Sequence, residues 1–412
     1  MGFYWLQDGV HKKLDSVRSN FLWQGAEDKF RYHMAKWEMI SRPKDQGGVG
    51  IINTRIMNDC LLVKWIWKIF SEPDDLWFKI IKAKYLGDGS FFDSKTKGSS
   101  QFWKGLHKVK HLFKWGAIFR VRNGNFCRFW QDCWVQNVPL SIAYNKLYSL
   151  VRDPTCKVSD CWDEGSWTMD FKRALSAEDY KSWLEICDSL TAYSLNSGDN
   201  DVVVWGLEKK GFFSTKSLYR FITNWGVSRL VAGYIWKCKI PLKIKFFLWQ
   251  SFNNKLQVAS CLAKRGWKGD VHCCLCGKIE SVNHLFFGCF LARLIWGMIK
   301  DVFSLEWYPS SLDDFTWFWL QGKGPLPSRL LMFLFAGFAW SLWTSRNKLA
   351  IEKCFPKAPT NVIYSAVSLM QHWSILLKED DKERIDNILK TILVWLRNFR
   401  RSSILQSDVM EL

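Results

Sequence analysis

The feature that most constrains this chain is a short run of cysteines with a histidine close behind it. Two residues separate Cys273 from Cys276, and His284 and Cys289 follow on short spacings. Loops this short can return sulfur and nitrogen atoms to one point, as a closed tetrahedral zinc site requires. We therefore predict one zinc ion, with Cys273, Cys276, His284 and Cys289 as its ligands. Because protein atoms would take all four positions, the ion would be structural and not catalytic.

Two residues beside this cluster leave its ligand set open. Cys274 or His272 could each replace a neighbour as a ligand. Only one residue separates Cys274 from Cys276, which is too few for the usual knuckle turn, so the spacing favours Cys273. The other alternative is that these cysteines are small buried apolar residues that bind no metal.

The sequence on both sides of the cluster resembles a known family. It is similar to the zinc-binding region that follows the polymerase in plant non-LTR (LINE-type) retrotransposon reverse transcriptases. Weaker similarity continues after Lys353. The segments that carry the resemblance are Phe21–Gly25, Arg42–Lys44, Gly47–Ile51, Val121–Asn125, Arg128–Asp132, Gly211–Tyr219, Ile235–Lys237, Ile240–Trp249, Asn254–Leu256, Leu262–Gly266, Glu280, Ile295–Trp296 and Trp340–Asn347.

The resemblance implies a fragment of a longer element, whose endonuclease and polymerase palm would lie before Met1. A polymerase needs paired aspartates on a hairpin to hold two metal ions. The adjacent pairs here, at 74–75, 313–314 and 380–381, lie at helix starts or in charged runs. Asp88-Gly89-Ser90 has the residue types that open a ribonuclease H domain, but no ordered set of acidic residues follows it. We therefore expect no catalytic site in this chain.

Composition and hydrophobic periodicity predict the fold class. A chain of 412 residues that is 48% hydrophobic can bury a sizeable core. We predict a mainly α protein with small β-hairpins (α+β), with helical domains around a small structural zinc site. The predicted division is a helical segment at 1–86 that resembles the post-palm end of the polymerase, a connector with a β-hairpin at 87–147, a linker at 148–200, the zinc-binding domain at 201–300 and a C-terminal helical region at 301–412.

Individual elements follow from local patterns. Asn123-Gly124 lies between residues 118–122 and 126–130 and indicates a tight hairpin. A second hairpin is predicted from 202–205 and 212–213, followed by a helix that Ser214 or Thr215 would cap. Helices are predicted at 8–24, 57–70, 75–85, 103–114, 178–190, 237–256 and 290–303, with a closing helix around 385–396.

The net charge and the tryptophan content indicate which kinds of partner the chain can bind. The chain has 58 Lys and Arg against 39 Asp and Glu, a net charge of +19 that favours nucleic acid or an acidic membrane surface. The longest apolar run, from Leu330 to Trp343, is too short to span a bilayer, so we expect a buried helix and no membrane partner. Most of the 26 tryptophans are expected in the core and not on base-stacking surfaces. Thirteen cysteines and the absence of a secretory pattern predict an intracellular protein, nuclear or cytoplasmic, with reduced thiols.

Basic residues provide the candidate nucleic-acid contacts. Lysines alternate with aromatic residues just before the zinc cluster, and arginines flank the Asn123-Gly124 turn. A solvated helix face or ribbon face is the alternative reading of both groups. The predicted contacts are Lys237, Lys239, Lys243, Lys245, Lys255, Lys264, Arg265, Arg120, Arg122 and Arg128.

Two functions follow from these residues. The first is a zinc-binding accessory region of a reverse transcriptase that binds RNA or DNA through the backbone, without sequence specificity and without its own catalysis. Its partners would be nucleic acid and the polymerase part of the parent element, with no small-molecule substrate. The alternative is a structural or protein-interaction module, left as a retroelement remnant, that binds no nucleic acid.

Overall fold

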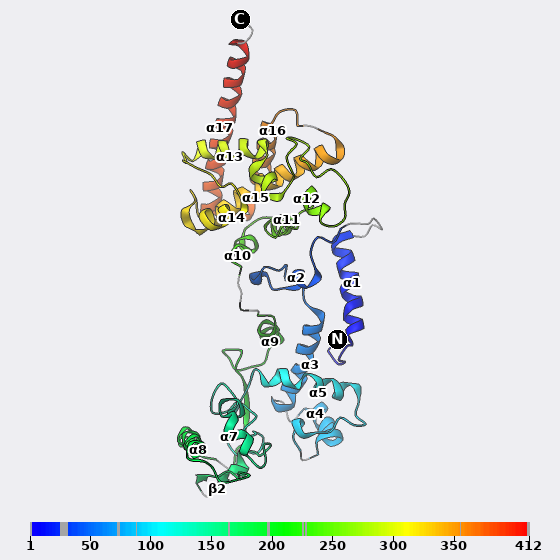
Figure 1. Ribbon diagram of the computed structural model, residues 1–412, viewed down its shortest axis with the longest axis vertical. Coiled ribbons are helices and arrows are strands. Elements are labelled where there is room, and N and C mark those ends of the chain that lie inside the picture. The colour runs from blue at the N-terminus through cyan, green and yellow to red at the C-terminus, as the bar shows by residue number, and fades with distance from the viewer. Residues whose placement is uncertain are drawn as a thin grey trace. The chain divides into compact units, whose positions relative to one another are not determined.

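The computed structural model describes residues 2–24, 32–71, 75–87, 89–163, 165–195, 198–224, 226, 229–354 and 356–409, and side chains as far as 399 (Figure 1). The chain forms two compact units. The first contains residues 1–16 and 53–224, and the second contains residues 17–52 and 225–412. Helix α1 (Asp8–Gln24) contributes residues to both units. Two of the five predicted segments, 1–86 and 201–300, contain residues of both units, and the boundaries of all five stay a prediction.

The first unit is a helical core with one small sheet. Helix α3 (Thr54–Ser71) packs against α5 (Gln101–Lys114) and α9 (Thr215–Ile222). Ser100 and Ser214 begin α5 and α9 by accepting hydrogen bonds from the backbone N–H groups of Trp103 and Ser217. The other helices are α4 (Leu76–Ile81), α6 (Leu140–Ala143), α7 (Asn145–Leu150) and α8 (Ala177–Leu190), with short turns at Lys82–Leu86, Phe91–Asp93 and Ser159–Cys161.

The strands of the first unit pair differently from the sequence prediction. Strand β1 (Ala117–Arg120) pairs antiparallel with β4 (Val202–Trp205), so that Ala117 lies opposite Trp205. Residues 126–130 form no strand, so the predicted hairpin around Asn123-Gly124 is wrong. The Asp201 carboxylate explains this, because it accepts the N–H groups of Arg122, Gly124, Phe126 and Cys127 at 2.8–3.2 Å. The chain therefore wraps around a carboxylate instead of turning back on itself.

The second predicted hairpin also has the wrong partner. Strand β4 pairs with β1, and Phe212 and Phe213 lie outside any strand. A turn does follow β4, because the Trp205 N–H donates to the Gly211 carbonyl at 2.8 Å. One true hairpin is formed by β2 (Trp162–Asp163) and β3 (Ser166–Trp167), within the region predicted to be a linker. That region also places Trp183 and Ile186 of α8 in the core of the first unit.

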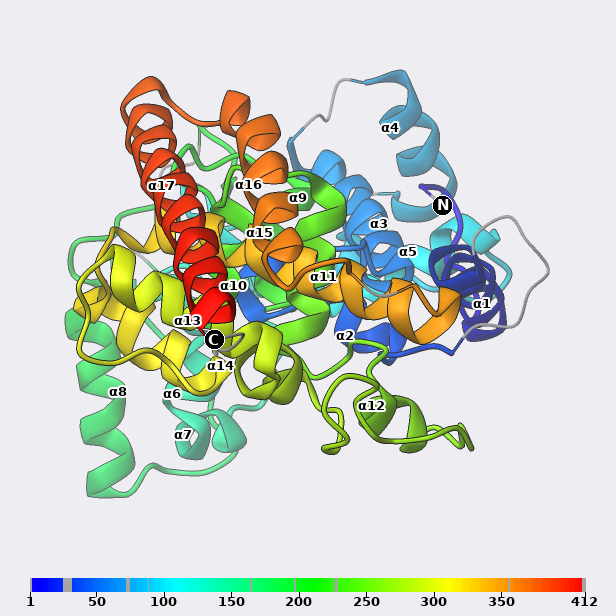
Figure 2. The same cartoon turned by 90° about the horizontal axis from the view of Figure 1, so that it is seen from above.

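The second unit is helical and surrounds α15 (Ser328–Asn347). This helix contains the apolar run that predicted a buried helix, and most of its side chains are buried. It packs against α16 (Thr360–Trp373), which in turn packs against α17 (Glu379–Val409), as Figure 2 shows. Ile385, Leu389, Ile392 and Leu396 lie buried on one face of α17, as predicted. The remaining elements are α2 (Trp37–Ser41), α10 (Leu230–Lys237), α11 (Leu242–Phe252), α12 (Ala259–Ala263), α13 (Phe290–Val302) and α14 (Leu312–Asp314), with turns at Lys44–Gln46, His284–Gly288, Phe315–Lys323, Lys348–Glu352 and Ser374–Leu376.

The lysine-rich segment before the cysteines is two helices and not the predicted single one. Helix α10 ends at Lys237, and α11 starts at Leu242, directly after Pro241. Proline has no N–H to donate and is tolerated at a helix start, so it favours a new helix here. Lys239 therefore lies in the connection and not on a continuous helix face.

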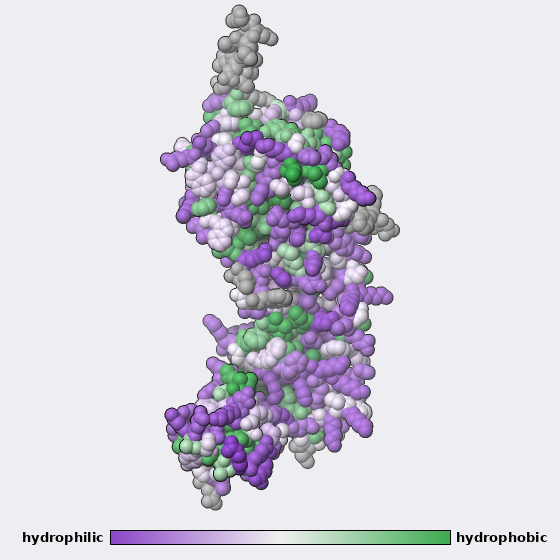
Figure 3. All heavy atoms as spheres, viewed as in Figure 1, coloured by the Kyte–Doolittle hydropathy of each residue, from purple (hydrophilic) through white to green (hydrophobic). Residues whose placement is uncertain are grey.

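The predicted fold class is confirmed. Helices dominate the described chain, and its two sheets have two strands each. Trp103, Trp130, Trp205 and Trp249 are among the largest fully buried side chains, in agreement with the core reading of the tryptophans. No helix in the described part of the chain combines the length and apolar content needed to cross a bilayer. Hydrophilic residues cover much of the visible surface, with smaller hydrophobic patches between them (Figure 3).

Candidate metal centre

The four predicted ligands converge in the second unit. The sulfur, sulfur, nitrogen and sulfur atoms of Cys273, Cys276, His284 and Cys289 all lie within 4.8 Å of one another. The Cys273 and Cys289 Sγ atoms are 4.0 Å apart, and Cys276 Sγ lies 3.2 Å from His284 Nε2. Ligand atoms about 2.0–2.3 Å from one zinc ion, at tetrahedral angles, would be roughly 3.5–3.8 Å apart. The donor set and its spacing therefore fit one zinc ion with no position left for substrate.

The first two ligands lie on a tight turn. The Cys273 N–H donates to the Lys278 carbonyl at 2.7 Å, and the Gly277 N–H donates to the Cys273 carbonyl at 2.9 Å. Gly277 has a φ of +69°, a conformation that glycine adopts without strain. This turn folds the chain back so that Cys276 comes close to Cys273.

The other two ligands lie where a helical turn meets α13. His284 opens a π-helical turn that ends at Gly288, and Cys289 immediately precedes the first residue of α13. The Cys289 N–H donates to the His284 carbonyl at 2.6 Å, which fixes the spacing between these ligands.

The protonation of the cysteines suits a metal site. The hydrogen bond with Cys289 lowers the pKa of the Cys273 thiol to about 4. The same bond, together with burial, raises the pKa of Cys289. One thiolate is therefore already favoured, and a bound cation would favour loss of the second proton.

The two alternative ligands lie outside the group. Cys274 is exposed, and its sulfur is not among the converging atoms. His272 is also exposed, and its Nδ1 lies 2.7 Å from Asp270 Oδ1. The geometry therefore brings Cys273 to the centre and leaves both neighbours at the surface.

The predicted nucleic-acid residues of the second unit fall into two groups. Lys237, Lys239 and Lys264 are exposed, and Lys255 is half-buried. The other three make specific contacts within the protein. Lys243 Nζ lies 5.3 Å from the ring centre of Trp340, Lys245 Nζ donates to the Trp236 carbonyl at 2.9 Å, and the guanidinium of Arg265 donates to the carbonyls of His33 and Met34.

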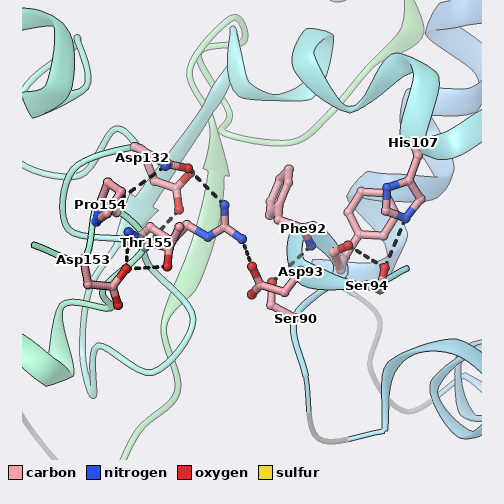
Figure 4. Close-up of polar contacts among 12 residues, drawn as sticks. Ser90, Phe92, Asp93, Ser94, His107, Asp132, Asp153, Pro154 and Thr155 are labelled. Atoms are coloured by element: carbon pink, nitrogen blue, oxygen red, sulfur yellow. Dashed lines mark hydrogen bonds and ion pairs between the residues drawn. The ribbon is translucent and has the colours of Figure 1, made fainter. Parts of the chain in front are cut away.

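The three predicted arginines of the first unit have different surroundings. Arg120 is exposed, and Arg122 lies 3.6 Å from Asp199 in an exposed ion pair. Arg128 is largely covered and is paired with Asp93, which Figure 4 shows beside Ser90 and Ser94. Because a side chain held in a covered ion pair is less available to a phosphate, Arg120 and Arg122 are the better candidates.

The acidic pairs are dispersed. Asp313 and Asp314 lie in α14, where Asp314 accepts from Ser310, and Asp380 and Asp381 lie in the first turn of α17. Asp74 and Asp88 lie outside the described residues. Among the residues that the structure does describe, the Cys/His group is the one cluster of three or more His, Cys, Asp or Glu that could hold a metal ion.

The geometry defines a closed zinc centre with three cysteines and one histidine in a helical frame. Residues 213–296, which include all four ligands, match the family model described as zinc-binding in reverse transcriptase. The chain therefore contains a region that matches the zinc-binding region of reverse transcriptases, and its three cysteines and one histidine fit one zinc ion.

Two relatives extend the match. A putative ribonuclease H protein of Arabidopsis thaliana is 28% identical over 329 residues, which is 75% of this chain and 52% of the relative. An uncharacterized mitochondrial protein of the same plant is 25% identical over 128 residues, 31% of this chain and 83% of that relative. The chain thus spans about half the length of the first relative.

Proposed function

We propose that this chain is an accessory region of a retroelement reverse transcriptase that binds RNA or DNA through the backbone, without sequence specificity and without a catalytic site of its own. In this proposal the zinc ion holds the fold, and exposed lysines make the contacts. The polymerase part of the parent element would be the second partner.

The observation that supports this proposal is the position of exposed lysines close in sequence to the zinc ligands. Lys237, Lys239 and Lys264 are exposed within the matched residues 213–296, in a chain of net charge +19. Ammonium groups that contact phosphates release condensed counterions and give affinity without reading bases.

Salt dependence tests the proposal. The zinc-loaded chain is titrated with labelled single-stranded and double-stranded oligonucleotides of unrelated sequence, at several salt concentrations. We expect binding to every sequence and a linear fall of log K with log salt, with a slope of about −0.7 per phosphate contact for single strands and −0.9 for duplexes. Absence of binding at low salt would favour the alternative, a structural or protein-interaction module.

The name of the first relative raises a second activity, which the same protein preparation can test. That relative is called a putative ribonuclease H protein, and the chain covers 52% of it. We expect no cleavage of an RNA–DNA hybrid in the presence of Mg²⁺. Cleavage that survives further purification would contradict the proposed lack of catalysis.

A further inference from the structure

A cavity in the second unit collects positive charge from three separate parts of the chain. Its volume is about 430 Å³. Lys237 and Lys239 line it from the end of α10 and the connection to α11, Arg329 from the start of α15, and Lys378 from the residue before α17. No local sequence pattern predicted that Arg329 and Lys378 would lie beside Lys237 and Lys239.

The floor of the cavity is apolar. Cys238 is 4% exposed and Leu330 is fully buried, and both line the cavity together with Leu377. Burial raises the pKa of Cys238 to about 12, so this thiol stays neutral. Cations at the rim above a neutral floor suit a phosphate attached to a less polar group such as a sugar.

The arginine of this cavity is held in position. Arg329 Nε and Nη2 donate to the two oxygens of Asp381 at 2.7 and 2.9 Å. This pairing lowers the pKa of Asp381, so the carboxylate stays charged. These two bonds use two of the five N–H donors, so both N–H groups of Nη1 and the second N–H of Nη2 remain for another acceptor.

Positive charge exceeds negative charge at the rim. Asp381 is paired with Arg329, and Asp380 is the other carboxylate that lines the cavity. Lys237, Lys239 and Lys378 are exposed, and among the described residues none of the three has a carboxylate within the 4.0 Å of an ion pair.

We propose that the cavity between Lys237, Lys239, Arg329 and Lys378 binds a phosphate group of a nucleic-acid chain. This inference rests on the proposed function and assigns one specific contact site for the nucleic-acid backbone. The ammonium groups of three exposed lysines and one oriented guanidinium can surround the phosphate oxygens, and the apolar floor can accept the adjoining sugar.

The test compares two triple variants of the full zinc-loaded chain with equal loss of charge. The cavity variant is Lys237→Gln, Lys239→Gln and Lys378→Gln. The control variant is Lys268→Gln, Lys348→Gln and Lys390→Gln, three exposed lysines of the same unit that do not line the cavity. Zinc content and thermal unfolding establish that both variants are folded.

The first readout is the affinity for a labelled single-stranded oligonucleotide as a function of salt. We expect the cavity variant to lose about tenfold or more in affinity and to have a salt slope smaller by at least about 0.7, the value of one phosphate contact. The control variant should lose less in both quantities. Equal behaviour of the two variants would overturn the cavity as a phosphate site and leave the proposed function standing.

The second readout needs no nucleic acid. Inorganic pyrophosphate should raise the unfolding midpoint of the wild type and of the control variant, but not that of the cavity variant. If the wild type binds no oligonucleotide while pyrophosphate stabilises it through these lysines, the proposed function fails and the anion site stands. If pyrophosphate stabilises all three proteins equally, or none of them, the cavity is not the site.

Discussion

Glu280 and Arg346 form a bidentate ion pair in the second unit. Arg346 Nε donates to Glu280 Oε1 at 2.7 Å, and Nη2 donates to Oε2 at 2.6 Å, with the two side chains 12% and 2% exposed. Glu280 Oε2 also accepts the Ala259 N–H at 2.8 Å. Glu280 lies two residues after Lys278, where the turn with the first two zinc ligands closes. Its bonds therefore connect the metal-binding loop to α15 and to the start of α12.

This pair predicts a large effect of removing its carboxylate. Glu280→Ala would leave Arg346 covered and uncompensated and the Ala259 N–H without its acceptor. We expect the free energy of unfolding to fall by about 3–5 kcal/mol, measured by urea denaturation of the zinc-loaded protein. Glu352→Ala, at an exposed glutamate of the same unit, should change it by less than about 0.5 kcal/mol. Equal effects of both changes would contradict this role of the pair.

Removal of the metal should unfold the centre. We expect one zinc per chain by elemental analysis of the wild type, and loss of zinc and of stability in the double variant Cys276→Ser, Cys289→Ser. Cys274→Ser is the matched control, because its exposed sulfur lies outside the converging group. Zinc loss in Cys274→Ser would show that the ligand set is wrong, and a folded wild type without zinc would exclude the site.

A glycine beside the histidine ligand predicts a more subtle effect. A Cβ atom at position 288 would lie 3.2 Å from His284 Nδ1, closer than an ordinary contact. We expect Gly288→Ala to shift the imidazole and weaken zinc affinity, measured by competition with a chelator. Gly297→Ala in α13 is the control, because a Cβ there meets nothing within 4 Å. That control should keep wild-type affinity, and a similar loss in both variants would point to a general effect on α13.

His107 in the first unit predicts a pH dependence of stability. Its Nε2 lies 3.1 Å from Ser94 Oγ, and its ring packs beside Phe91 and Trp103 (Figure 4 labels His107 and Ser94). Burial, followed by repulsion from Lys110, lowers the pKa of His107 from 6.5 to about 4. Between these two values the unfolded chain binds a proton that the folded chain does not bind, so stability decreases as the pH falls.

The contribution of His107 to stability is therefore complete above pH 6.5 and is lost progressively as the pH falls to about 4. The measurement is the urea midpoint of the first unit at pH 7.5 and pH 5. We expect the decrease between these two values to be smaller in His107→Gln than in the wild type. His372→Gln, at an exposed histidine of α16, should keep the wild-type decrease. An unchanged decrease in His107→Gln would show that other groups cause it.

The features that depend on neighbouring residues could be predicted from the sequence. The outer zinc ligands are 16 residues apart, and short loops between ligands leave few ways to place the donor atoms. Apolar periodicity likewise predicted the buried face of α17, and an unbroken apolar run predicted α15, because burial of apolar surface favours these helices wherever they pack.

The contacts between residues far apart in the sequence could not be predicted in this way and depend on the tertiary fold. Asp201 binds the backbone around Gly124, and β1 pairs with β4, although Asn123-Gly124 favours a local hairpin. The Glu280–Arg346 pair joins residues that are 66 apart, and the basic cavity brings Lys237 close to Lys378. The physical reason is that a carboxylate or an ammonium group can bind any complementary group that folding brings near it, whereas periodicity and spacing report only the chain's immediate surroundings.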